Sequence, residues 1–203
     1  MQIFDFEQRT PEWYNIRLGK LTASNAGTIA TGGKGLETLC LELIADFYSD
    51  YQKEVYTNEH LERGNELEDV AKCVYELQTG NIVQNVGFVL IDDYSGVSPD
   101  GVIYKKDKII KSIEIKCPSD KVYMNVLLNN YIDPSYYAQM QMQMYGLQTN
   151  EVDYVVYNPH FKKDLIINTI KRDEEFIKKL EAGLEKGKSI LKKYHDIMKK
   201  VNQ

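Results

Sequence analysis

The residue types best suited to chemistry lie between two short motifs, SPDG and EIKCP. Between them, the run IIKSIEIK is rich in β-branched residues, which favour a strand, and successive side chains of a strand point to opposite faces. Glu114 and Lys116 would therefore share one face, while Ile113 and Ile115 would face a core. The Asp-Gly turn signal and the charged KKD segment predict a hairpin that returns Asp100 towards Glu114.

Two carboxylates and one ammonium group gathered at the end of a β-ribbon favour metal binding. Asp100 and Glu114 would repel each other unless a cation lay between them. Hard oxygen ligands in a chain with few histidines suit Mg²⁺, with Mn²⁺ as a substitute. The alternative is a solvated pair of Glu114 and Lys116 on an exposed strand, because ion pairs are common in antiparallel sheets. Spacing alone leaves both interpretations open.

A short helix near the N-terminus carries a second type of binding residue. TPEWYNIRL begins with an N-cap threonine and a proline at the first helical position, so Gly19 would end a helix with Arg17 in its last turn. A second helix is expected to start at Ser24. A guanidinium group and a helix N-terminus both suit a phosphate. The alternative for Arg17 is a salt bridge to Glu12 or Glu68.

Hydrophobic periodicity predicts the remaining elements. Two helices are expected to bury Leu36, Leu39, Cys40, Leu43, Ile44 and Phe47 in the first and Leu67, Val70, Ala71, Val74 and Leu77 in the second, which Gly80 would end. NIVQNVGFVLI, VDYVVYN and DLIINTI are typical of strands. QMQMQM alternates like a strand, but Asp133 as a cap followed by Pro134 favours a helix. These elements predict an α+β fold with a mixed central β-sheet flanked by helices.

Length and composition favour one folded unit. The 203 residues contain no repeat or linker, so we expect a single domain over residues 1–203, with its core at about 8–175 and a C-terminal helix at about 173–201. Three scattered cysteines without CxxC spacing indicate reduced thiols. The first residues lack the apolar run of a signal peptide and no segment has the length of a membrane span, so we expect a cytoplasmic protein without membrane contact.

The charge is distributed unevenly along the chain. A net charge of −5 by itself disfavours a non-specific nucleic-acid binder. From residue 162 onward, however, twelve Lys or Arg residues accompany seven Asp or Glu residues, so this part carries about +5 and the remainder about −10. The basic part could follow a phosphate backbone, or it could be the solvated face of a helix.

Five motifs occur together in the order and approximate spacing of a known family. They are WYNIRLGKLTAS, RGNELE, SPDG, EIKCP and YAQMQMQM. One such motif would carry little information, but five in register argue against coincidence. Over residues 8 to about 175, the chain resembles the exonuclease of bacteriophage lambda and the YqaJ-type viral recombinases, which have a PD-(D/E)XK (restriction-endonuclease-like) nuclease core.

The resemblance implies a role for each matching residue. Asp100, Glu114 and the backbone carbonyl of Ile115 would bind the metal, and Glu68 would support the site directly or through water. Lys116 would orient the attacking water, either as a cationic clamp or as a base with a lowered pKa. The positions that match the family's site for the phosphate and the 5′ end are Arg17, Ser24, Ser98 and Gln139, together with Trp13 as an aromatic residue beside the entering strand.

The same resemblance implies an activity and partners. We expect a Mg²⁺-dependent 5′-to-3′ exonuclease that acts on linear double-stranded DNA ends and leaves 3′ single-stranded tails for phage-type recombination by strand annealing. The family also implies 5′-phosphorylated ends, a homo-oligomer in the form of a trimeric ring, a single-strand annealing protein as partner, and a bacterial cell as location. The alternatives are a PD-(D/E)XK endonuclease or junction resolvase, and a catalytically silent DNA-binding module.

Overall fold

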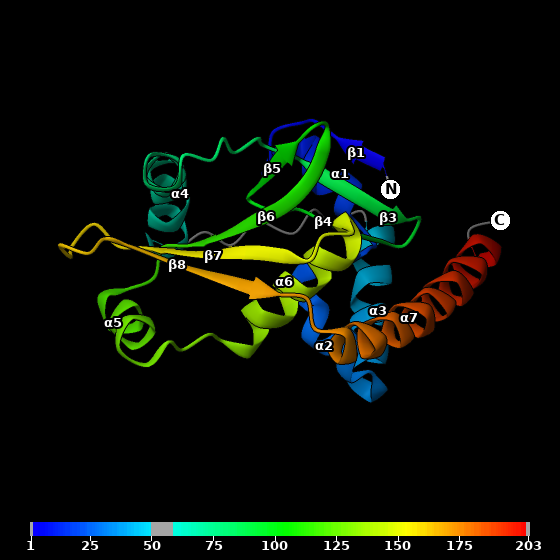
Figure 1. Cartoon of the computed structure of the whole chain (residues 1–203). Coiled ribbons are helices and arrows are strands. Elements are labelled where there is room, and N and C mark those ends of the chain that lie inside the picture. Colours follow the sequence, from blue (N-terminus) through cyan, green and yellow to red (C-terminus); the bar gives the residue numbers. More distant parts are fainter. Residues whose placement is uncertain (1, 50–58, 202–203) are drawn as a thin grey trace.

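The structure, a computed structural model, describes residues 2–49 and 59–201 (Figure 1). The side chains at 59–62 and 65 lie outside this description. Within the described residues the strands form two four-stranded sheets, both mixed, and helices pack around them. The α+β class and the helix-flanked mixed sheet are therefore confirmed, although the sequence had predicted one sheet where the structure has two.

The larger sheet contains the predicted hairpin. Its strands are β5 (Gly101–Lys105), β6 (Lys108–Lys116), β7 (Glu151–Tyr157) and β8 (Leu165–Lys171), in the order β5-β6-β7-β8. The pair β6 and β7 is parallel, and the other two pairs are antiparallel. Gly101 pairs with Ile113, so the start of β5 lies beside the end of β6 and brings Asp100 to the level of Glu114.

Helices cover both faces of this sheet. They are α4 (Glu59–Thr79), α5 (Asp120–Asn129) and α6 (Pro134–Leu147). On one face, Ala71 and Tyr75 of α4 belong to a buried cluster with residues of all four strands. On the other face, Tyr123 of α5 and Met140 of α6 pack against β7 and β8. The parallel pair is thus buried on both sides, as parallel strands usually are.

The helix α6 confirms the prediction for QMQMQM. The Asp133 side chain accepts a hydrogen bond from the Ser135 N–H at 2.8 Å, and Pro134 is the first helical residue, so the cap outweighs the alternating pattern. The helix α5 was not predicted, although Ser119 stands at its N-cap position.

The buried face of α4 differs from the predicted one. Gly80 follows the helix with φ 69°, as predicted, but Val70 is 45% exposed and Leu77 is 87% exposed. Tyr75 takes the buried position, because its hydroxyl donates a hydrogen bond of 2.7 Å to the Asp153 Oδ2 atom and so remains satisfied inside the core.

The smaller sheet is built from short strands. They are β1 (Gln2–Phe4), β3 (Phe88–Asp92), β4 (Ser95–Val97) and β2 (Leu21–Thr22), in the order β1-β3-β4-β2. Only the second half of the predicted strand NIVQNVGFVLI is β3, and Gln84 before it forms an isolated bridge with Val102. A Cβ atom at Gly96 would lie 2.2 Å from the Phe88 ring, so glycine is what allows β4 to approach β3.

The N-terminal helices correct one predicted boundary. The helix α1 (Pro11–Arg17) begins as predicted, with the Thr10 hydroxyl accepting from the Trp13 N–H. The predicted helix start at Ser24 is wrong, because Ala23–Asn25 is a 3₁₀ turn and α2 (Ala26–Thr31) follows it.

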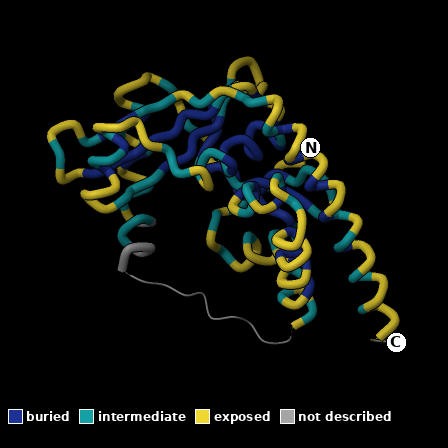
Figure 2. The backbone as a smooth tube through the Cα atoms, turned by 90° about the horizontal axis from the view of Figure 1, so that it is seen from below, coloured by how far each residue is buried: buried dark blue, intermediate teal, exposed yellow. Residues whose placement is uncertain are grey.

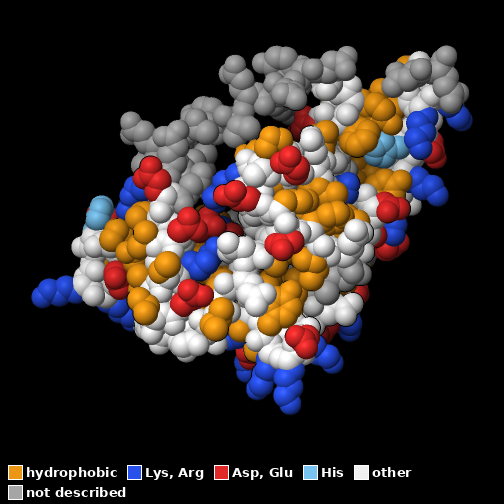
Figure 3. Space-filling view, turned by 90° about the horizontal axis from the view of Figure 1, so that it is seen from above, with side chains coloured by type: hydrophobic (Ala, Val, Ile, Leu, Met, Phe, Trp, Pro, Cys, Tyr) orange, Lys and Arg blue, Asp and Glu red, His pale blue; other side chains and the backbone are white. Residues whose placement is uncertain are grey.

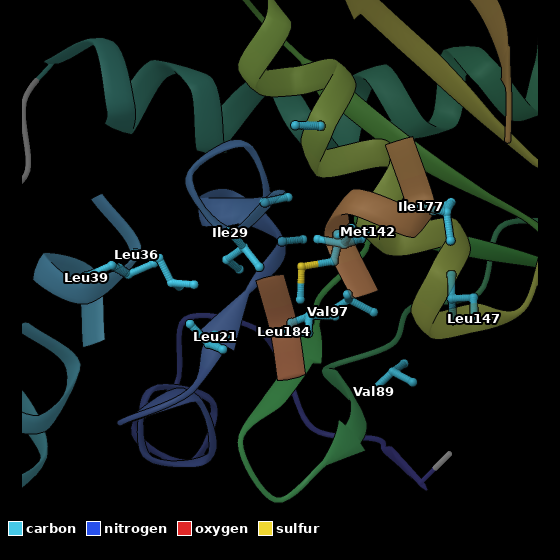
Figure 4. Close-up of a cluster of buried hydrophobic side chains, with 14 of the residues drawn as sticks. Leu21, Ile29, Leu36, Leu39, Val89, Val97, Met142, Leu147, Ile177 and Leu184 are labelled. Carbon is cyan, nitrogen blue, oxygen red and sulfur yellow. The ribbon is translucent and has the colours of Figure 1, made fainter. Parts of the chain in front are cut away.

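Two longer helices complete a second core beside the sheets (Figure 4). They are α3 (Gly33–Tyr48) and α7 (Glu174–Val201). Leu36, with Leu39, Cys40 and Ile44, is buried as predicted, whereas Phe47 is 44% exposed and contacts the His195 ring at the edge of the core. The helix α7 starts where the Asp173 carboxylate accepts the backbone N–H groups of the next turn.

The burial pattern follows this arrangement. In Figure 2, buried backbone runs through the sheets, and the C-terminal end of α7 is largely exposed. Among the helices of the described residues, none is both long and apolar enough to cross a membrane.

Candidate active site

One cavity of about 360 Å³ lies where the two sheets and the helices α1, α4 and α6 meet. Every residue that the sequence singled out lines it, and the structure therefore brings the whole set together. These residues are Trp13 and Arg17 from α1, Ser24 from the 3₁₀ turn, Glu68 from α4, Ser98 and Asp100 from the loop between β4 and β5, Glu114, Ile115 and Lys116 from β6, and Gln139 from α6.

The acidic pair sits at the inner end of the hairpin. Glu114 is fully buried, and its two oxygens accept hydrogen bonds of 2.5 Å from the Lys116 Nζ and the Gln143 Nε2 atoms. The Asp100 Oδ2 atom accepts a hydrogen bond of 2.7 Å from the Ile115 N–H. The alternative of a solvated Glu114 and Lys116 pair on an exposed strand is thus wrong, because Glu114 is fully buried and α6 supplies Gln143 as its partner.

Burial sets the charge balance of the pair. Removal from water, followed by the nearby charge of Glu114, raises the pKa of Asp100 well above its usual value. For Lys116, burial lowers the pKa, but Glu114 and Asp100 together raise it above its usual value. The Tyr136 ring lies 4.7 Å from the Lys116 ammonium and covers one side of it.

Burial, followed by the charge of Glu68, also raises the pKa of the Cys117 thiol to about 12, which argues against a thiolate nucleophile in this cavity.

The donor set fits a hard divalent cation. The neighbouring carboxylates of Asp100 and the buried Glu114 carry charge that a cation would relieve, as the raised pKa of Asp100 indicates. Within the described ranges, no group of three or more His, Cys, Asp or Glu side chains is arranged to hold a metal. A protein site for Mg²⁺ commonly supplies only one or two carboxylates, and water and substrate phosphates complete the coordination. The set is therefore compatible with Mg²⁺.

Arg17 does not form the salt bridge to Glu12 or Glu68 that was its alternative role. Its Nη1 atom donates a hydrogen bond of 3.0 Å to the Ser98 hydroxyl, and its guanidinium group lies 4.1 Å from the centre of the Trp13 ring. The Trp13 indole N–H in turn donates to Ser98 and to the Gly87 carbonyl. Burial lowers the pKa of Arg17 to about 10, and Arg17 forms no salt bridge with a described residue. A partly buried cation that lacks a carboxylate partner among the described residues is suited to an anionic ligand.

The carboxylate of Glu68 is paired, but with a residue that the sequence did not single out. Its partner is Arg9, which lies directly before the cap of α1. No local pattern connects two positions 59 residues apart, so sequence reasoning had no signal for this pair.

The Ser24 side chain has a partner next to it in the chain. Its hydroxyl oxygen lies 3.1 Å from the hydroxyl oxygen of Thr22, within hydrogen-bond distance.

Two other lining or supporting residues were also missed, and for these a signal existed. Tyr136, Gln139 and Gln143 are spaced at three and four residues, so one face of the predicted helix α6 presents them together. Of the three, only Gln139 was assigned to the site. Gln143 reaches Glu114, and Tyr136 reaches Lys116.

Comparisons with known proteins agree with this geometry. Residues 12–148 match the model of the YqaJ-like viral recombinase domain. The structure is similar to that of an alkaline exonuclease (LHK-Exo) from Laribacter hongkongensis, with a TM-score of 0.83, 29% identity, and coverage of 95% of this chain and 98% of that chain. The same figures hold for LHK-Exo in complex with dAMP.

A more distant likeness concerns the fold alone. The structure of a phage-related exonuclease from Haemophilus somnus 129PT has a TM-score of 0.61 and 18% identity, over 91% of this chain and 96% of that chain. No functionally curated protein matches the chain. Because the family model covers more than half of the sequence, including most of the residues that line the cavity, the chain belongs to the family of YqaJ-like viral recombinase domains.

Proposed function

We propose that this protein is a metal-dependent exonuclease that degrades one strand of linear duplex DNA from the 5′ end and leaves a 3′ single-stranded tail. The observation that carries the proposal is the shared cavity, in which Asp100 and the buried Glu114 lie with Arg17, a partly buried cation that has no acidic partner among the described residues. The names of the similar structures, an alkaline exonuclease and its complex with dAMP, support this choice and a mononucleotide product.

The acidic residues would form the cation site. Asp100, Glu114 and the backbone carbonyl of Ile115 would hold Mg²⁺, or Mn²⁺ in its place, with Glu68 acting directly or through water. When bound there, the cation would neutralise the negative charge that develops on the phosphate and leaving-group oxygens during hydrolysis. Gln143 holds the Glu114 carboxylate in a fixed orientation, which keeps the pair preorganised for this task.

Lys116 would act on the attacking water. Its ammonium group is held by the Glu114 Oε1 atom and by the Tyr136 ring, so its position is defined by contacts on two sides. From there it would orient the water or stabilise the charge of the transition state. A role as general base is the alternative for the same residue.

Arg17 and its neighbours in the cavity would bind the 5′ phosphate. Arg17 offers a planar set of donors, and Trp13 and Ser98 fix that group by stacking and hydrogen bonding. Ser24 and Gln139 would add neutral donors, and the Trp13 ring would lie beside the entering strand. A terminal phosphate bound here would place the adjoining phosphodiester bond at the acidic pair, which is how a nuclease of this kind would select chain ends.

The test is a digestion panel with Mg²⁺. Its substrates are linear duplex with a 5′ phosphate, linear duplex with a 5′ hydroxyl, closed circular duplex and single strand. We expect the phosphorylated linear duplex to be digested fastest, the circle to stay intact, and chelation of the metal to stop digestion. Cutting of the circle would instead favour an endonuclease or junction resolvase, and binding without digestion would favour a silent DNA-binding module.

A variant of Arg17 sharpens this test. Arg17→Lys keeps the charge but loses the planar set of donors, so it should reduce the preference for the 5′ phosphate while the metal requirement remains. An undiminished preference would remove Arg17 from the phosphate site. The trimeric ring, the single-strand annealing partner and the cytoplasmic location stay predictions of the family resemblance.

A further inference from the structure

Arg9 occupies an unusual position at the rim of the cavity. Its backbone has φ 67°, a left-handed conformation that is uncommon for residues other than glycine. Its side chain crosses to α4 and forms an ion pair with the Glu68 carboxylate. Both residues line the cavity that contains Asp100. This backbone conformation helps to set the direction of the Arg9 side chain, which extends to Glu68 in the cavity.

The neighbouring contacts hold that backbone in place. The Gln8 side-chain amide donates hydrogen bonds to the Val86 carbonyl at 2.9 Å and to the Pro99 carbonyl at 2.8 Å. The Thr10 hydroxyl donates to the Glu7 carbonyl at 2.8 Å. Because Pro99 directly precedes Asp100, the loop that carries Arg9 is fastened to the loop that carries a proposed metal ligand. The conformation of Arg9 is therefore imposed by contacts on both sides of it.

The ion pair with Glu68 uses only part of the guanidinium group. A guanidinium carries five N–H groups in one plane, and among the described residues only the Nη2 atom of Arg9 has a partner. The Arg9 side chain is 43% exposed, while that of Glu68 is 17% exposed. Donors that face water at the rim of a cavity remain available to a ligand.

The charges of the cavity point to the kind of ligand. Arg9 and Arg17 flank the short helix α1, one before its cap and one in its last turn, and both line the same cavity. DNA bound with its terminal phosphate at Arg17 presents further phosphates along the strand. A second guanidinium at the rim is suited to one of them, since paired N–H groups match phosphate oxygens.

We propose that Arg9 is a second phosphate-binding residue. One N–H group holds the Glu68 carboxylate beside the acidic pair, and the remaining groups bind a backbone phosphate of the DNA strand in the cavity. Arg9 thus couples the position of the DNA backbone to the position of a residue that supports the cation site. This inference rests on the proposed function, because it assumes that the cavity binds DNA.

The test measures DNA binding, so that it does not depend on turnover. The probe is a fluorescent linear duplex with a 5′ phosphate, titrated without divalent metal over a range of salt concentrations. Arg9→Gly removes the side chain and suits the positive φ, so it should fold as well as the parent protein. The control Lys186→Ala removes another half-exposed cation, which pairs with Glu37 and does not line the cavity.

We expect Arg9→Gly to bind about tenfold more weakly than the parent protein at low salt, as loss of a charge-assisted hydrogen bond predicts. The slope of the logarithm of the binding constant against the logarithm of the salt concentration should become shallower by about 1, the value for one phosphate contact. Arg9→Lys should recover the slope because it keeps the charge. Lys186→Ala should leave both quantities unchanged.

A second comparison separates phosphate binding from a purely structural role through Glu68. If Arg9 acts only by holding Glu68, then Arg9→Gly should have no further effect on binding in a Glu68→Gln protein. That result, or an unchanged salt slope in Arg9→Gly, would overturn the inference while the proposed nuclease function stands. A parent protein that neither binds nor digests duplex DNA would overturn the function itself together with this inference.

Discussion

Burial distinguishes Glu114, one of the two proposed catalytic carboxylates, from the ordinary acidic residues on the surface. Glu114 is fully buried, yet each of its oxygens has a hydrogen-bond donor, so its charge is tolerated inside the protein. Asp100 has only the Ile115 N–H as a hydrogen-bond partner among the described residues. The charge of Asp100 is therefore compensated by fewer hydrogen bonds than that of Glu114. Replacing Asp100 should accordingly disturb the fold less than replacing Glu114.

Asp100→Asn is the first test of the site. The asparagine keeps the shape and the acceptor for the Ile115 N–H but removes one charge beside Glu114. We expect digestion to be abolished, while circular dichroism shows the parent fold and the unfolding midpoint without metal is not lowered. The matched control is Asp107→Asn at the exposed hairpin tip, where φ is 62° and asparagine is well tolerated. Near-normal digestion by Asp100→Asn would show that the metal site is misassigned.

Lys116→Gln tests the proposed action on the attacking water. Loss of one preorganised charge from a transition state should lower the turnover number by about 10²-fold or more. Binding of Mg²⁺, measured by calorimetry, should persist because the proposed ligands Asp100 and Glu114 remain. The exposed Lys108, at the other end of β6, provides the control as Lys108→Gln. Unchanged turnover, or metal binding that falls in step with turnover, would exclude the proposed role.

Among the helices and strands, the docking of α7 depends on close contact. At Gly183, a Cβ atom would lie 1.9 Å from the Ile29 carbonyl oxygen, and at Gly187 it would lie 2.7 Å from a methyl group of Leu21. The first neighbour is backbone of α2 and cannot move alone, whereas the second is the end of a flexible side chain. These glycines let α7 approach α2 and the cluster in Figure 4.

Alanine substitutions should therefore have graded effects on stability. Alanine favours a helix over glycine by about 1 kcal/mol at an open position. Gly183→Ala should nevertheless destabilise the protein by about 1–3 kcal/mol or more, and Gly187→Ala by less, as overpacking predicts. Gly35→Ala in α3 meets only an ordinary contact of 3.5 Å and should be neutral or stabilising. Urea unfolding measures all three, and a Gly183→Ala protein as stable as its parent would contradict this packing.

The sequence was sufficient for the long elements and for the hairpin that carries the acidic pair. A turn signal and a β-branched run define β5 and β6, and a clear cap decided α6 against its alternating pattern. Strands of two or three residues, such as β2 and β4, are too short for any periodicity. The exposure of Leu77 was also not predictable from α4 alone, because the tertiary contact between Tyr75 and Asp153 decides which face is buried.

All the site residues assigned from the motifs line the cavity. The residues that contact them could be predicted from the sequence only in part. Gln143 could have been found from its helical spacing to Gln139. Arg9 could not, because its pairing with Glu68 depends on how the loop before α1 lies against α4. The roles of these residues remain predictions until the variants are measured.

For the protein as a whole, the distribution of charge limits how DNA can approach. The net charge is −5, and Figure 3 shows acidic side chains scattered over one face with Lys and Arg side chains gathered near several of its edges. A negatively charged protein that binds DNA must concentrate its cations where the strand lies. In the cavity, Arg9, Arg17 and Lys116 offset the negative charges of Glu68, Asp100 and Glu114.

The direction of digestion tests the proposed function most directly. One strand of a linear duplex is labelled at its 5′ end in one sample and at its 3′ end in another, and release of acid-soluble label is followed with Mg²⁺. With the 5′ phosphate bound at Arg17 and cleavage at Asp100 and Glu114, the 5′ label should be released from the earliest times, while the 3′ label stays in long product until late. Release of the 3′ label first, or of both labels together through internal cuts, would contradict the proposal.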